Sequence, residues 1–175
     1  MSLGIVGAGA AAETETTRFE GSDTFADYVP CVSEFPSLEG FEITIEFEGV
    51  SHSTETENGH RFSERVSGTF SAVPVLLADE DENGEPDFDE ATGSFVIAGP
   101  RDGESFTGTF ADSGSGNFNK DDHTVTLRHT FKVRGIGDEG TDVNHHENAH
   151  ITSLGGCPCD PSAIVRVDFI KAKCH

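Results

Sequence analysis

The stretch that decides the fold class is FEITIEFE, residues 41–48. Apolar side chains alternate there with Glu and Thr at every second position, which is the period of a β-strand with one buried face. The stretch TVTLRHTFKV, residues 124–133, repeats the pattern with Thr, Arg and Lys on one side and mainly apolar residues on the other. Both segments therefore predict strands that cover a core on one face only.

Further strands are predicted on either side of these two. Phe62, Val66 and Phe70 share one face of a strand, and residues 141–152 are expected to return beside 124–133 after a glycine-rich turn. Residues 94–98 and 104–110 are expected to pair across a Gly-Pro-Arg-Asp-Gly turn, and Val165, Val167 and Phe169 end the series. With about eight strands and no convincing helix, the expected fold is an antiparallel β-barrel or β-sandwich.

The net charge of the chain limits the classes of partner that are possible. The 175 residues include 32 Asp and Glu but only 11 Lys and Arg, which gives a formal charge of −21. This excludes nucleic acid as a partner, because phosphate binding needs clustered basic residues. The 14 Phe and the periodic pattern predict a folded chain and not a disordered one. Such acidity is typical either of a surface adapted to high salt or of an ordinary acidic secreted protein.

The N-terminus carries a hint of export. MSLGIVGAGAAA, residues 1–12, is small and apolar like the end of a secretion signal, although the basic segment of such a signal is missing. A flexible leader is the alternative. We expect residues 1–15 to be a leader and residues 16–175 to form a single β domain with an acidic insertion at 79–90. No apolar run is long enough to span a membrane, and the expected location is extracellular or at the cell surface.

Four cysteines agree with an oxidising compartment. Cys31 and Cys174 bracket the patterned region, so we predict a disulfide between them. Cys157 and Cys159 form the remaining pair; a bridge within Cys-Pro-Cys is strained, so either of them could pair elsewhere or hold a metal. Four cysteines allow three connectivities, and the sequence does not choose among them.

Several short motifs occur together along residues 31–174. Cys31 precedes the first long strand, Gly-Val-Ser follows it at 49–51, HENAHIT lies at 146–152, and Cys174 closes the series. This combination resembles a family of small secreted β-proteins, mostly actinobacterial and largely uncharacterised. The acidic segment 79–90 and the Cys-Pro-Cys segment depart from the family pattern. The resemblance implies secretion and a β-fold, and it implies no activity.

The segment DEDENGEPDFDE, residues 79–90, has the spacing of a twelve-residue calcium loop. Calcium prefers six to eight oxygen ligands, and Gly84 stands where such a loop must turn sharply. Pro86 replaces a usual hydrophobic residue and the flanks are strand-like, so a solvated acidic hairpin is the alternative. The expected ligands are Asp79, Asp81, Asn83, Glu85, Asp87 and Glu90.

Residues 146–150 spell HExxH, the zinc motif of metalloproteases when it lies on a helix. Ile151 and Thr152 favour a strand instead, and the glycines and prolines of 155–161 would end a helix at once. On a strand, His146 and His150 would lie about 13 Å apart and could not share one ion. A protease is therefore a remote alternative.

In a strand over 141–152, His145 and Glu147 share the more apolar face with Val143, and a hairpin would bring them near His129. Two histidines and a carboxylate inside a barrel could bind a transition metal or perform acid–base chemistry. A buried, hydrogen-bonded polar cluster is the simpler interpretation.

These observations favour a secreted, non-enzymatic β-domain for extracellular ligand binding or surface assembly, stiffened by disulfides and a calcium loop. A small apolar ligand, or self-association through an edge strand or the N-terminal arm, would suit such a domain. The alternative is an enzyme of cyclase or isomerase type that uses His129, His145 and Glu147 in a barrel interior. No organic cofactor is expected.

Overall fold

The structure, a computed structural model, describes residues 13–33, 36–121, 123–154 and 164–174. These residues form β-strands and no helix, which confirms the predicted all-β, antiparallel class. The strands are β1 (Glu13–Asp27), β2 (Glu39–Thr56), β3 (Gly59–Leu77), β4 (Phe88–Asp89), β5 (Ser94–Phe95), β6 (Ile97–Pro100), β7 (Phe106–Asn119), β8 (Thr124–Gly137), β9 (Asp142–Leu154) and β10 (Ile164–Cys174).

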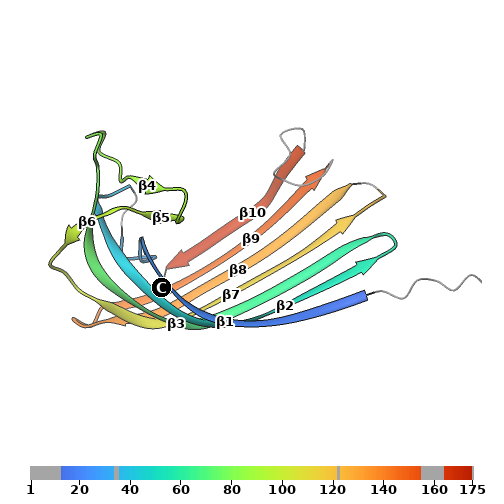
Figure 1. Ribbon diagram of the computed structural model, residues 1–175, viewed down its shortest axis with the longest axis horizontal. Helices are drawn as coiled ribbons and strands as arrows, with labels where there is room; N and C mark the ends of the chain where they lie inside the picture. Colours follow the sequence, from blue (N-terminus) through green and yellow to red (C-terminus); the bar gives the residue numbers. More distant parts are fainter. Residues whose placement is uncertain (1–12, 34–35, 122, 155–163, 175) are drawn as a thin grey trace, which may run out of the picture.

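One long, strongly bent antiparallel sheet makes up most of the protein (Figure 1). Its strands follow the order β1-β2-β3-β7-β8-β9-β10, and the small β4–β5 sheet lies on the inner side of the bend. Within the described ranges, β1 pairs only with β2 and β10 only with β9. The sheet is therefore open at both edges, and the predicted barrel or sandwich is not confirmed.

The predicted hairpin of residues 94–98 with 104–110 is wrong. β5 pairs with β4, whereas β6 and β7 lie end to end along the same edge of β3. The connection between them stays attached to β3, because the Arg101 amide donates a hydrogen bond to the Pro74 carbonyl and its side chain forms an ion pair with Glu39. The chain therefore continues along β3 at the point where the sequence suggested a reversal.

The N-terminal boundary also differs from the expectation. β1 begins at Glu13, and residues 13–15 pair with residues 53–55 of β2. The end of the stretch assigned to a leader therefore belongs to the sheet. Residues 1–12 lie outside the described part of the chain.

Most buried apolar side chains of the sheet share one face, which we call the core face, and the opposite face is the outer face. A smaller buried cluster includes Ala26 and Val75, which belong to the outer face by register. Alternation in β2 points Phe41 and Ile43 to the core face, and the antiparallel registers carry that face across to Phe106 in β7 and Val133 in β8. Full burial of each large apolar side chain stabilises the fold by about 1.5–3 kcal/mol. The buried core cluster contains Val29, Phe41, Ile43, Phe70, Ala72, Phe106, Val133 and Val143.

Phenylalanine rings cover glycines on the core face. In five cross-strand pairs the two residues stand directly opposite each other, and a Cβ on the glycine would collide with the ring. Aromatic residues placed over strand glycines let a sheet bend while they shield its backbone. The pairs are Gly21 with Phe47, Gly49 with Phe19, Gly68 with Phe110, Gly108 with Phe70, and Gly116 with Phe62.

Residues 28–33, which we call the strap, cross the core face from the end of β1 towards the end of β10. Val29 is 1% exposed and packs in the core cluster. The predicted disulfide between Cys31 and Cys174 is confirmed, with the two Cα atoms 5.6 Å apart. The strap therefore links the two unpaired edges of the sheet at one end, while the other end of the core face stays open (Figure 1).

Candidate functional site

An apolar cavity of 240 Å³ opens on the core face beside the strap. Strands β1, β2, β3, β7 and β8 form its floor, and the strap forms one wall. Among the described residues that line it, only Asp27 and Tyr28 are polar. A concave, preformed and mostly apolar site of this kind suits a small ligand. The apolar lining residues are Phe25, Val29, Pro30, Ile43, Ile45, Phe70, Phe110, Phe131 and Val133.

Beyond the strap, the core face continues as an open trough of apolar side chains. Phe62 is 41% exposed and Ile170 is 59% exposed, and both point to the core face by register. Soluble proteins rarely leave a contiguous apolar surface of this kind without a binding partner. The trough residues are Phe19, Phe47, Phe62, Val66, Leu127, Ile151 and Ile170.

The trough carries acidic residues but no Lys or Arg within the described ranges. Glu64, Asp112 and Glu147 belong to the core face by register. Every Lys and Arg that lies in a strand points instead to the outer face. A charged ligand in the trough would therefore meet negative potential.

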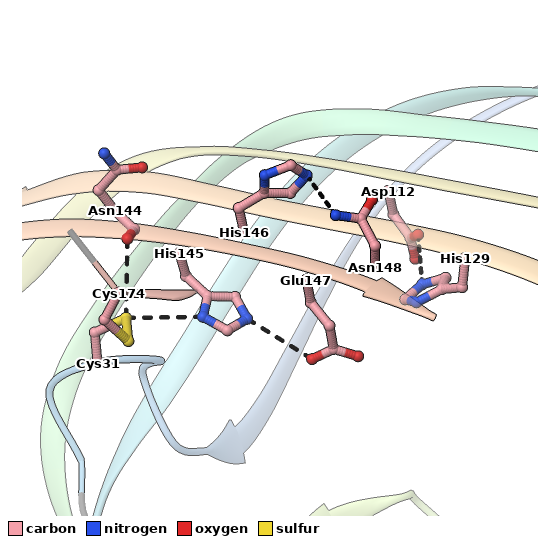
Figure 2. A network of polar contacts seen from close by, with 9 residues as sticks. All are labelled: Cys31, Asp112, His129, Asn144, His145, His146, Glu147, Asn148 and Cys174. Carbon is pink, nitrogen blue, oxygen red and sulfur yellow. Dashed lines mark hydrogen bonds and ion pairs between the residues drawn. A yellow bond between two sulfur atoms is a disulfide. The ribbon is translucent and has the colours of Figure 1, made fainter. Parts of the chain in front are cut away.

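His145 lies between the disulfide and Glu147 on the core face (Figure 2). Its Nδ1 is 3.7 Å from Cys31 Sγ, and its Nε2 is 3.7 Å from Glu147 Oε2. In the described ranges, Cys31, His145 and Cys174 are the one group of three metal-ligand-type residues whose ligand atoms lie within 4.8 Å of one another. With the two sulfurs joined to each other, no thiolate is left to bind a metal.

The predicted cluster of His129, His145 and Glu147 is only partly assembled. All three residues share the core face, but His129 stands opposite Ala149, while Val133 stands opposite His145. His129 Nε2 lies instead 2.7 Å from Asp112 Oδ1, a residue that the sequence analysis did not select (Figure 2). None of the three predicted residues lines the 240 Å³ cavity. His129 and Asp112 line a separate cavity of 210 Å³.

The HExxH segment lies in strand β9 and not in a helix. His146 and His150 point to the outer face, and Glu147 points to the core face. His146 Nε2 is hydrogen-bonded to the Asn148 amide at 3.1 Å. The two histidines and the glutamate therefore do not converge as a zinc protease requires.

The acidic segment 79–90 forms a tight turn held by its own side chains. Asp79 Oδ1 accepts a hydrogen bond from the Asn83 amide, and Asp79 Oδ2 accepts one from the Gly84 amide, each at 3.0 Å. Gly84 has a φ of 85°, in the left-handed region that glycine adopts readily. Among the predicted ligands, no three of the carboxylates of Asp79, Asp81, Glu85, Asp87 and Glu90 bring oxygen atoms within 4.8 Å of one another in the described structure. Cys157 and Cys159 lie outside the described residues.

The sequence does not predict the cavity or the strap, because residues 28–33 carry no periodic pattern. It does not indicate Asp112 as a site residue either, because the composition of ADSGSGN, residues 111–117, is typical of a loop. The alternation of phenylalanines and glycines from Phe106 to Phe118 was the available signal for a strand there.

The fold and the core face together define an all-β protein with an open, apolar and acid-lined trough. No protein-family model matches the chain, and no curated protein or solved structure matches it either. No helix in the described ranges is long and apolar enough to cross a membrane.

Proposed function

We propose that the protein is a secreted, non-enzymatic β-domain that binds an extracellular ligand on its core face. The ligand is an extended apolar molecule whose tail enters the 240 Å³ cavity and whose remainder lies along the trough. The cavity and its apolar lining carry this proposal. The disulfide supports export, because such bonds persist in oxidising compartments.

Charge selects among apolar ligands. Glu64, Asp112 and Glu147 face the same side as the cavity, and no strand Lys or Arg does so. A carboxylate head group would be repelled there, whereas a neutral or cationic head group would not. The proposed ligand class is therefore a neutral or cationic amphiphile, and free fatty acids are disfavoured.

The test is competition against an environment-sensitive fluorescent acyl probe. Unlabelled dodecylamine and dodecanol should displace the probe more effectively than dodecanoate does at neutral pH. Phe62→Ser should weaken the binding of the probe and of its competitors several-fold, because it removes an exposed ring from the trough. Ile136→Ser is the matched control, since Ile136 is an exposed apolar residue on the outer face. Absence of saturable probe binding would overturn the proposal.

Calcium binding by segment 79–90 belongs to the same proposal as a stabilising feature. The turn at Gly84 supports it, as do the hydrogen bonds by which the Asp79 and Asn83 side chains hold the amides of residues 83–85. Calcium would then act on the loop and not on the trough.

An enzyme remains the second candidate. The pair of His129 and Asp112, 2.7 Å apart beside a cavity of 210 Å³, supports general acid–base chemistry there. If that candidate is right, His129→Gln should abolish turnover of a bound amphiphile and leave probe binding unchanged. If no turnover accompanies binding, the ligand-binding role stands alone.

A further inference from the structure

Basic and acidic residues are distributed unevenly over the outer face of the sheet. Nine of the eleven Lys and Arg residues lie on it, although the whole chain has a formal charge of −21. On β3, β7 and β8 this face carries no carboxylate, and on β9 only Asp142 at the strand's beginning. The acidic residues of the outer face gather on β1 and β2 as Glu20, Glu42, Glu46 and Glu48.

A cleft of 440 Å³ lies over β3, β7 and β8 in this region and extends to Val50 and His52 of β2. Arg65 on β3 and Arg128 on β8 flank it, and the small Ser113 and Ser115 of β7 form its floor between them. Ser63 and Thr130 add hydroxyl groups, and His52 closes one side. Glu64 and Gly114 also line the cleft, but strand alternation points the Glu64 side chain to the core face.

The spacing suits two converging guanidinium groups. β3 and β8 are separated by one strand, so their backbones lie about 9–10 Å apart. Arginine side chains are long enough to reach over the intervening serines from both sides. Neither Arg65 nor Arg128 makes an ion pair or hydrogen bond with another residue of the described ranges. Both guanidinium groups therefore have their donors available for a ligand.

We propose that this cleft binds a tetrahedral oxyanion, a sulfate or phosphate group, between Arg65 and Arg128. The guanidinium groups would donate charge-assisted hydrogen bonds, and the hydroxyls of Ser113 and Ser115 would donate the remaining ones. The strongly acidic remainder of the surface repels long polyanions, so the proposal concerns a single sulfate or phosphate group. The site lies on the face opposite the trough and is independent of the proposed amphiphile.

The experiment is a titration of the ¹⁵N-labelled protein with sulfate and with phosphate at constant ionic strength, with chloride as the replaced ion. The amide signals of Ser113, Ser115 and Thr130 should shift and saturate. A monosaccharide sulfate in a parallel titration separates the sources. Tighter binding than free sulfate identifies a sulfated sugar as the ligand, and equal or weaker binding identifies the free ion; both support the proposal.

Arg65→Gln and Arg128→Gln should each weaken binding by about tenfold or more, because each removes charge-assisted hydrogen bonds to the anion. Arg134→Gln is the matched control, since Arg134 lies on the same face of β8 but outside the cleft. An equal loss in that control would show only a diffuse positive field and would overturn the proposal. Absence of saturation in the wild-type protein would overturn it too, whatever the amphiphile experiments show.

Discussion

Cys31 and Cys174 are joined although 143 positions separate them in the sequence. Cys31 belongs to the strap and Cys174 ends β10, so the bond connects the two edges of a sheet whose edge strands do not pair in the described structure. At one end of the sheet, this covalent bond joins the two edges, which hydrogen bonds between the first and last strands would join in a closed barrel. The disulfide therefore holds the strap over the core and maintains the cavity wall.

Removing this bond should destabilise the fold strongly. In the loop-closure model a bridge over a segment of this length contributes about 5 kcal/mol, and strain or residual structure reduces the measured effect. We expect the Cys31→Ser/Cys174→Ser variant to lose several kcal/mol in urea unfolding, and a reductant to affect wild type in the same way. A reductant should change the double variant little, and an unfolding midpoint equal to that of wild type would contradict the prediction.

The glycines under the phenylalanine rings should resist substitution. A Cβ on Gly116 would meet the Phe62 ring and the Leu127 side chain, whereas a Cβ on Gly114 would meet no atom within 4 Å. Both residues lie on the core face of β7. Gly116→Ala should therefore destabilise the protein by about 1–3 kcal/mol through overpacking. Gly114→Ala should be neutral or stabilising by up to about 1 kcal/mol, and equal effects in thermal unfolding would refute the role of the rings.

The same glycines explain where the sequence was informative and where it was not. FEITIEFE predicted β2 correctly because its alternation is local and complete. The serine–glycine run at 113–116 reads as a loop by composition, yet it is strand, because rings from neighbouring strands supply the packing that its own residues lack. Such cross-strand support depends on register, which the periodicity of one segment does not contain.

In the candidate site, too, local alternation predicted some features, whereas others depended on register. The shared face of His129, His145 and Glu147 followed from alternation alone. The partner of His129 could not be predicted in the same way, because it depends on the register of β8 with β7. This register sets Phe131 opposite Asp112 and leaves His129 next to the Asp112 carboxylate. The cleft between Arg65 and Arg128 could not be predicted for the same reason. These two residues are 63 positions apart in the sequence, and they lie near each other only because β3 and β8 both pair with β7.

Stability should depend on pH through Glu104. Hydrogen bonds from the Thr141 side chain and backbone and from the Glu139 amide keep the pKa of Glu104 below its ordinary value of 4.5. The contribution of the ionised carboxylate is therefore complete above the unfolded-state pKa and is lost as the pH falls through the lower native pKa. Glu104→Gln should destabilise the protein at neutral pH and make stability less sensitive to pH between about pH 5 and pH 2. Glu57→Gln, in the exposed β2–β3 turn, is the control for the removal of one carboxylate from the surface.

The acidic surface should make stability depend on salt. With a formal charge of −21, self-repulsion destabilises the folded protein until ions screen it. If the acidity is an adaptation to high salt, the melting temperature should rise steeply between low and molar KCl. A melting temperature that stays flat over this range would reject that interpretation.

Calcium should stabilise the loop of residues 79–90. Without a cation, the acidic side chains of this segment repel one another at short range, and Asp79 already folds the loop around the amides of Asn83 and Gly84. A divalent cation would neutralise that charge and bind the native state, which raises the melting temperature by mass action. We expect a weak site with a dissociation constant of roughly 10⁻⁴–10⁻³ M, because strand-like flanks and Pro86 replace the usual surroundings of such loops.

Two substitutions separate coordination from simple charge removal. Glu90→Gln should abolish the calcium-dependent rise in melting temperature, because position 90 supplies the twelfth-residue carboxylate of the motif. Glu82→Gln removes the same charge from the same loop but off the ligand pattern, so it should leave the rise intact. Asp79→Ala should abolish the rise and also lower stability without calcium, because it removes the acceptors for two loop amides. If calorimetry detects no calcium binding at millimolar concentrations, segment 79–90 is a solvated acidic turn, because the side-chain hydrogen bonds of Asp79 then suffice to fold it.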